Sequence, residues 1–146
     1  MMKIRISDKQ DIPVNITGIR KLVRCVFVQE GLSGAPGEVS IMLVDDGGMR
    51  ELNRKFLSRN RPTDVIAFRM WEGPFHQLHP EILGDVVVNV AQARRLEKDF
   101  QTELDLYIVH GLLHLLGYVD DTGSNARVMQ ERCDCILKKC EIKRGK

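Results

Sequence analysis

The sequence lacks the long hydrophobic runs and the aromatic clusters that several classes of protein require. No segment of the 146 residues reaches the roughly 18 uninterrupted apolar residues that would span a bilayer. The N-terminus carries a charge every few residues and has no apolar core of the kind that a signal peptide needs. Trp71 and the two tyrosines are too few and too scattered to form a platform on which bases stack. These absences predict a soluble, cytoplasmic protein, and the length is typical of one compact domain spanning residues 1–146.

The positions of the cysteines favour core packing over a disulfide framework or a second metal site. The four cysteines are Cys25, Cys133, Cys135 and Cys140. A cytosolic chain of this size can bury an ample core without disulfides, so we expect reduced thiols. Cys133 and Cys140 fall on the apolar stripe of the last predicted helix, whereas a Cys-x-Cys pair points its two thiols about 200° apart. We therefore expect buried core thiols there.

Hydrophobic periodicity predicts an α+β fold, in which a small, mostly four-stranded sheet packs against helices. Strands are expected at residues 3–6, 39–44, 65–68 and 85–90, and the last of these is the most apolar and so is placed centrally. Helices are expected at residues 19–27, 49–57, 91–99 and 102–116 and beyond Thr122, which can cap the last one. The helix at 102–116 has a strongly apolar interior, so we expect it to be buried at the centre of the domain.

Two histidines on this central helix have the spacing of metal ligands. His110 and His114 are four residues apart, which places both side chains on one face, one turn apart. A catalytic zinc site uses three protein ligands and leaves a fourth position open. One helical face supplies only two of them, so the third must come from chain that has turned back, and Gly117 is placed to make that turn. Asp120 and Asp121 follow the glycine, and either carboxylate is an acceptable zinc ligand.

His110 and His114 do not form the sequence motif found in zincin proteases. Those enzymes carry H-E-x-x-H, in which the glutamate beside the first histidine is the general base. The corresponding residue here is Gly111. The spacing therefore indicates a metal site without indicating a protease.

Three segments of the chain resemble the motifs of a known family. The string HGLLHLLGY, residues 110–118, is similar to the pattern H-G-x-x-H-L-x-G-Y-D-H of the YbeY family of rRNA maturation factors. The string RPTDVIAF, residues 61–68, resembles the family's P-T-D-V-L-S-F-P strand, and LGDV, residues 83–86, resembles its L-G-D-I. Order and spacing agree from about Val39 to Met129. Three motifs in order are far more specific than one.

Two departures from the family pattern matter for the site. Where the family has its third histidine, this chain has Asp120, so the resemblance implies a ligand set of two histidines and one aspartate. A carboxylate lowers the net charge of the site by one, and oxygen ligands suit manganese or magnesium better than imidazole does. The family also usually has an arginine after the aromatic residue that ends the short helix, whereas Leu57 follows Phe56 here.

The resemblance implies a metal-dependent endoribonuclease, specific for single strands, that acts in rRNA maturation and ribosome quality control. The implied cofactor is one zinc ion held by His110, His114 and Asp120, with other divalent metals as alternatives. The implied chemistry is metal-assisted hydrolysis of a phosphodiester bond.

The implied catalytic residues are His114 together with two arginines of the loop before the third strand. Arg59 and Arg61 are expected to neutralise the charge that develops on the phosphate, and Arg69 is a further candidate. The implied partners are ribosomal RNA and ribosomal particles, contacted mainly through backbone phosphates, with no membrane partner. The net charge of +2 is compatible with such a partner without requiring one.

Two other functions are compatible with the same residues. One alternative is a ribosome assembly factor whose metal only stabilises the fold, and the other is a metallohydrolase of another substrate class on the same scaffold. Asp85 either orients a ligand or simply begins a strand. His76 and His79 lie in a Gly- and Pro-containing segment and are expected to be surface residues.

Overall fold

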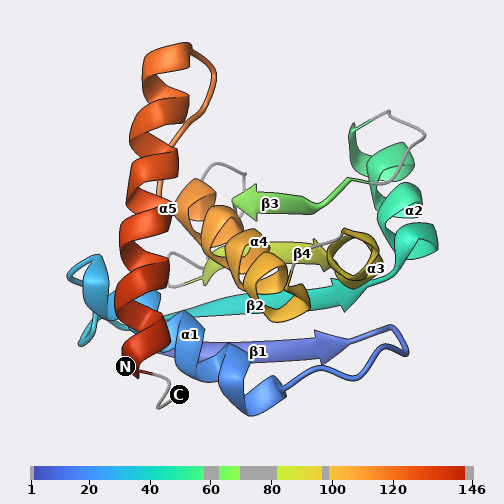
Figure 1. Ribbon diagram of the computed structural model, residues 1–146, viewed down its shortest axis with the longest axis horizontal. Helices are drawn as coiled ribbons and strands as arrows, with labels where there is room; N and C mark the ends of the chain where they lie inside the picture. Colours follow the sequence, from blue (N-terminus) through green and yellow to red (C-terminus); the bar gives the residue numbers. More distant parts are fainter. Residues whose placement is uncertain (1, 58–62, 70–81, 97–98, 144–146) are drawn as a thin grey trace.

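The computed structural model describes residues 2–57, 63–69, 82–96 and 99–143. These residues form four strands and five helices (Figure 1). In chain order the elements are β1 (Met2–Asp8), α1 (Ile16–Gln29), β2 (Gly37–Val44), α2 (Asp46–Leu57), β3 (Val65–Arg69), β4 (Ile82–Asn89), α3 (Val90–Arg95), α4 (Phe100–Leu115) and α5 (Gly123–Lys143). The α+β class that the periodicity predicted is confirmed. No helix of the described residues is long and apolar enough to cross a bilayer.

The four strands form one mixed sheet in the order β1-β2-β4-β3. β1, β2 and β4 are parallel, and β3 runs antiparallel to β4 at the edge of the sheet. The interior position of β4 agrees with its apolar sequence, because an inner strand of a covered sheet is buried on both faces. Val86, Val87 and Val88 are each at most 2% exposed.

One face of the sheet carries α1, α4 and α5 and holds the main core (Figure 1). α4 is the central helix and packs on β3, β4, α1 and α5. Buried apolar residues line most of its surface: Leu104, Tyr107, Ile108, Val109, Leu112, Leu113 and Leu115. The predicted burial of this helix is therefore confirmed, although its N-terminal turn and the two histidines near its C-terminal end are partly exposed.

The opposite face of the sheet is covered by α2 over a smaller apolar cluster. Val44, Met49, Ile66 and Val87 are its buried members. Asp85 precedes Val86 in β4, so its side chain lies on this face, in a pocket away from α4. Burial raises the pKa of Asp85, and a hydrogen bond with Ser40 acts in the opposite direction. Asp85 therefore does not orient the histidines of α4.

Two helix boundaries differ from those that the sequence predicted. α2 begins at Asp46 rather than at residue 49, because the Asp45 carboxylate accepts a hydrogen bond from the backbone N–H of Gly48 at 2.9 Å and caps the first turn. α3 ends at Arg95 rather than at 99, and Val90 belongs to this helix rather than to the strand before it. Asn89 caps α3 through a 3.2 Å bond from the backbone N–H of Gln92.

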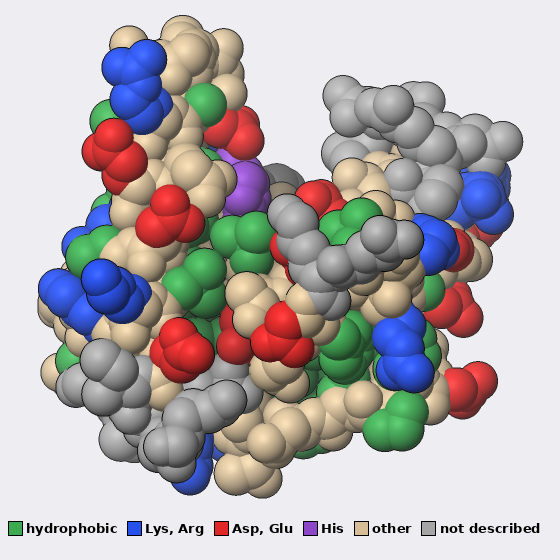
Figure 2. All heavy atoms as spheres, in the orientation of Figure 1, with side chains coloured by type: hydrophobic (Ala, Val, Ile, Leu, Met, Phe, Trp, Pro, Cys, Tyr) green, Lys and Arg blue, Asp and Glu red, His purple; other side chains and the backbone are tan. Residues whose placement is uncertain are grey.

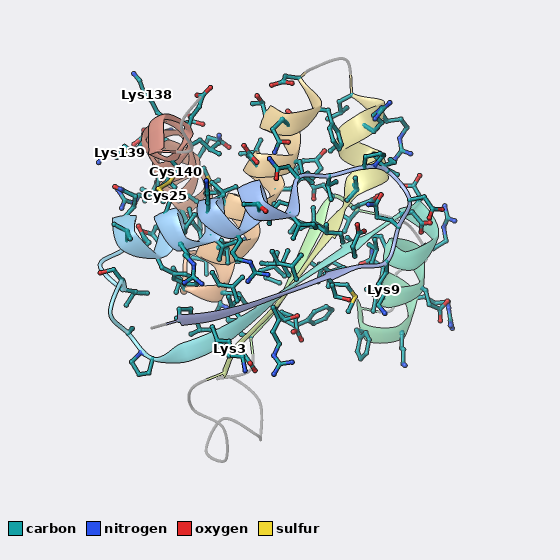
Figure 3. All side chains as sticks on the ribbon, turned by 90° about the horizontal axis from the view of Figure 1, so that it is seen from below. Lys3, Lys9, Cys25, Lys138, Lys139 and Cys140 are labelled. Carbon is teal, nitrogen blue, oxygen red and sulfur yellow. A yellow bond between two sulfur atoms is a disulfide. The ribbon has the colours of Figure 1, made fainter. Side chains whose placement is uncertain are left out.

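A disulfide joins α1 to the last turns of α5, where the two helices lie side by side (Figure 3). It links Cys25 to Cys140 across 115 residues of sequence, with the Cα atoms 5.8 Å apart. The expectation of four reduced thiols is therefore wrong for this pair. The expected core location is right for Cys133 and Cys140, both fully buried, and Cys133 and Cys135 are free thiols.

Candidate metal centre

α4 brings its two histidines together at its C-terminal end. The Nε2 atoms of His110 and His114 are 2.9 Å apart, and the ring centroids are 4.7 Å apart. The rings are 32% and 25% exposed, so both reach the surface while the helix behind them is buried. The histidine side chains are visible beside the first turns of α5, which project beyond the sheet (Figure 2).

The turn after α4 returns the chain to the histidines. Gly117 has a φ of +105°, a conformation that glycine adopts far more readily than other residues. Its N–H donates to the carbonyl of His114 at 3.1 Å, and the N–H of Tyr118 donates to the carbonyl of Leu113 at 3.0 Å. These two bonds form a Schellman motif, the common way of ending a helix at a glycine. The reversal expected at this glycine is therefore present.

The reversal brings the carboxylate of Asp120 to the two rings. Its Oδ2 atom lies 3.7 Å from Nε2 of His110 and 3.6 Å from Nε2 of His114. Asp121 points elsewhere, because its Oδ1 accepts a 2.7 Å hydrogen bond from Asn125 at the start of α5. Of the two acids that the sequence left open, Asp120 is the one that joins the histidines.

The three side chains have the chemistry and the spacing that a tetrahedral cation requires. Zinc bound at 2.0 to 2.1 Å in a tetrahedron sets its ligand atoms about 3.3 Å apart. The three observed separations, 2.9, 3.6 and 3.7 Å, lie on both sides of that value. Among the described residues, these are the only three His, Cys, Asp or Glu side chains found to offer ligand atoms close enough together for a metal. The residues present therefore fit the metal that the sequence implied.

The electrostatics of the site favour a neutral imidazole at His110. Burial lowers the pKa of His110, and the neighbouring His114 acts in the same direction. The carboxylates of Asp64 and Asp120 oppose this shift. A neutral ring keeps the lone pair that a metal needs, whereas a protonated ring has none.

His114 has one hydrogen bond at its ring and another at its own backbone carbonyl. Its Nδ1 lies 3.1 Å from the carbonyl oxygen of Tyr118, and its own carbonyl accepts a 2.8 Å hydrogen bond from Nε of Arg69 on β3. A carbonyl oxygen can only accept, so Nδ1 of His114 carries a proton, and in the neutral form of the ring Nε2 then has the lone pair. Arg69 was predicted as a phosphate contact. Its Nε bond stabilises the C-terminus of α4, and its phosphate role stays a prediction.

Close packing under His110 explains the glycine that follows it. A Cβ at Gly111 would lie 2.4 Å from Cγ1 of Val86 and 2.9 Å from Cγ2 of Val65. α4 therefore approaches β3 and β4 closely at this point, and a side chain here would push it away. A glutamate at position 111, the base of zincin proteases, has no space.

A buried asparagine, which the sequence analysis did not single out, positions the segment that carries Asp64. Asn89 is fully buried, and its Nδ2 donates to the carbonyl of Thr63 at 3.1 Å and to Oδ1 of Asp46 at 2.8 Å. Its backbone N–H donates to the carbonyl of Asp64 at 2.8 Å. These bonds keep Asp64 where its charge acts on His110. The sequence signal that could have indicated this role is an asparagine at the end of an apolar strand.

Several predicted site residues lie outside the described residues. These are the two expected catalytic arginines, Arg59 and Arg61, and the loop residues His76 and His79. Near the end of α2, Phe56 is 56% exposed and meets Phe68 edge-on at 5.5 Å between ring centroids. The roles of Arg59 and Arg61 stay predictions.

Comparison with known proteins identifies the family. The sequence profile described as "Endoribonuclease YbeY" matches residues 4–141. The chain belongs to the YbeY family. A relative named endoribonuclease YbeY from Syntrophus aciditrophicus is 38% identical over 125 residues, covering 83% of this chain and 71% of the relative. Another YbeY relative with the same name, from Moorella thermoacetica, is 34% identical over 157 residues and covers 98% of this chain and 100% of its own.

A solved structure supports the fold of this YbeY family member. The solution structure of a Thermotoga maritima protein superposes with a TM-score of 0.60 at 20% identity, covering 98% of this chain and 93% of that one. At this identity the likeness concerns the fold alone. The family expected from the three motifs is confirmed.

Proposed function

We propose that the chain is a metal-dependent endoribonuclease that cleaves single-stranded RNA in the cytoplasm during rRNA maturation and ribosome quality control. Its proposed metal is one zinc ion on His110, His114 and Asp120, and its proposed partners are ribosomal RNA and ribosomal particles. The observation that carries this proposal is the convergence of three ligand atoms, all within 4.8 Å of one another, at the exposed end of a buried helix. The names of the relatives supply the substrate class.

Each residue of the centre has a defined part in this proposal. His110 and His114 are proposed to bind the ion through Nε2: burial disfavours the charged form of His110, and Nδ1 of His114 donates a hydrogen bond to the carbonyl of Tyr118, which leaves Nε2 for the metal. Asp120 adds one negative charge, so the loaded site is less positive by one than with three histidines. When bound, a divalent cation supplies Lewis-acid chemistry at a phosphoryl oxygen and a nucleophile derived from water. Arg59 and Arg61 are proposed to neutralise the charge that grows on the phosphate.

The central test measures metal content and RNA cleavage in the same preparations. We expect about one ion per chain, because the described residues present one such set of ligands. A chelator should reduce cleavage of a single-stranded RNA oligonucleotide to background, and returning zinc should restore it. His114→Ala removes a ligand and should be inactive with or without added zinc, while circular dichroism shows a folded chain.

The outcomes distinguish the proposals. Undiminished cleavage by metal-free protein would overturn the metal-dependent mechanism. Protein that holds its metal, leaves RNA intact and loses only thermal stability on chelation would instead be an assembly factor with a structural ion.

The identity of the third ligand has a matched pair of variants. Asp120→Ala is expected to lose the metal at micromolar zinc, because only two nitrogen ligands remain. Asp121→Ala removes the neighbouring carboxylate and leaves all three ligand atoms in place, so its metal content should equal that of the wild type. Metal bound per chain, measured by atomic absorption after dialysis, decides the assignment. The reverse pattern would move the ligand to Asp121.

The assembly factor is the second candidate, because of Asp120 and Leu57. Both differ from the residues that the family usually has, and both stand where metal or phosphate chemistry is expected. A peptide hydrolase of the zincin type is disfavoured, because Gly111 leaves no space for the glutamate that such enzymes use.

A further inference from the structure

A hydrogen-bonded network centred on Glu30 connects the end of α1, the turn after α4 and α5. The side chain of Glu30, at the end of α1, is only 10% exposed. Its Oε1 accepts a 2.8 Å hydrogen bond from the hydroxyl of Tyr118, and its Oε2 accepts a 2.7 Å bond from Nε of Arg132 on α5. Arg132 also donates to the carbonyl of Gln29 at 2.7 Å. The carboxylate is thus held from both sides, which makes it a rigid anchor.

Tyr118 connects this anchor to the candidate metal centre. Its side chain is bound to Glu30, whereas its carbonyl lies 3.1 Å from Nδ1 of His114. Its N–H closes the helix through Leu113, and Asp120 follows two residues later. Tyr118 therefore contacts Glu30, the last turn of α4 and the proposed metal ligand His114 at the same time.

The position of that carbonyl favours the tautomer in which His114 can act as a ligand through Nε2. A neutral imidazole carries one proton, on Nδ1 or on Nε2, and only the ring with its proton on Nδ1 has a lone pair on Nε2. Nε2 is the atom that faces His110 and Asp120. If the carbonyl moves away, the Nε2-protonated form is no longer disfavoured, and binding a cation then has to shift the proton first.

We propose that Glu30, Tyr118 and Arg132 are positioning residues of the metal centre, acting by holding the Tyr118 carbonyl against His114. This inference rests on the proposed metal site. The network lies outside that ligand set, and Glu30 and Arg132 are 102 residues apart in the sequence. Partners of ligating histidines typically change metal affinity by about 10- to 100-fold when they are removed.

The test uses Tyr118→Phe, which removes one hydroxyl and keeps the ring, the backbone and the Schellman turn. In metal-free protein, long-range ¹⁵N–¹H spectra of the His114 ring should change from the Nδ1-protonated form to a mixture of both forms. Zinc affinity, measured by competition with a chromophoric chelator, should fall about 10-fold or more. The melting temperature of the metal-free protein should change little, because a single neutral donor is lost while Arg132 still satisfies the carboxylate.

Two further variants keep the test specific. Val119→Ala truncates a 43% exposed side chain between Tyr118 and Asp120, outside the network, and should leave both the tautomer and the affinity unchanged. Glu30→Gln should weaken zinc binding as well. The double variant Glu30→Gln with Tyr118→Phe should bind zinc no more weakly than the single variant of lower affinity, because both substitutions act through one contact.

The inference and the metal site fail in different ways. A Tyr118→Phe protein with the wild-type tautomer and wild-type zinc affinity overturns the positioning role while leaving the metal site intact. Wild-type protein that takes up no zinc overturns the metal site, and the spectra of the metal-free protein then decide alone whether Tyr118 fixes the His114 ring.

Discussion

Replacing Gly84 by alanine is expected to lower the free energy of unfolding by roughly 2 to 6 kcal/mol, the sum of about 1 to 3 for backbone strain and about 1 to 3 for overpacking. Gly84 has a φ of +140°, and its Cβ would lie 2.0 Å from the carbonyl oxygen of Phe68 on β3. That oxygen belongs to the backbone and cannot rotate away. The residue also faces Leu115 of α4, whose Cδ2 would be 3.1 Å from the new atom.

The control for this variant is another glycine of the same chain. Gly34 has no neighbour within 4 Å of a built Cβ and has a φ outside the left-handed region, so Gly34→Ala should change stability by less than about 1 kcal/mol. Urea denaturation followed by circular dichroism measures both. Equal effects of the two substitutions would contradict the packing described between β3, β4 and α4.

Breaking the disulfide between Cys25 and Cys140 is expected to lower the free energy of unfolding by an amount comparable to that of Gly84→Ala. A link that closes 115 residues restricts the unfolded chain strongly, and loop entropy assigns about 4 to 5 kcal/mol to it, within a usual range of about 2 to 5. Cys25→Ala with Cys140→Ala, or treatment with a reductant, should therefore lower the midpoint of urea denaturation markedly. Non-reduced, denatured protein should contain two titratable thiols, from Cys133 and Cys135.

The matched control is Cys135→Ala, which removes a half-buried free thiol. This variant should keep its sensitivity to reductant, whereas the double variant should have none. Four titratable thiols in the non-reduced wild type would show that the link between α1 and α5 does not form.

Most of the fold could be predicted from the sequence, because the apolar pattern and the end signals of its elements agree. β4 is recognisable as an inner strand from a run of valines, and α4 as a buried helix from apolar residues on every side. The start of α2 was missed because Gly47 and Gly48 are poor helix formers, and a local cap from Asp45 outweighs their low propensity.

The candidate metal ligands could be predicted because they lie close together in the sequence. Two histidines one turn apart, a glycine stop and an acid three residues later all fall within eleven residues, from His110 to Asp120. The choice between Asp120 and Asp121 was not settled by the residues alone, because it depends on the direction in which the loop leaves Gly117. The bond from Asn125 to Asp121 leaves Asp120 facing the rings.

The parts that the sequence could not supply are contacts between distant segments. Glu30 meets Arg132 and Cys25 meets Cys140 only because α1 and α5 pack side by side. Arg69 was named as a candidate phosphate contact because it borders the edge of the third predicted strand. Its bond to the carbonyl of His114 depends on the placement of β3 beside the end of α4.

The direction of α4 has a consequence for the binding of the ion and the RNA. The peptide dipoles of a helix add up to about half a negative charge at its C-terminal end, which is where the histidines and Asp120 meet. This end attracts a cation and repels a polyanion such as the proposed RNA substrate. A bound cation cancels both the dipole and the carboxylate, so each ligand strengthens the binding of the other by the same factor. The orientation of one helix therefore couples binding of the ion to binding of the RNA.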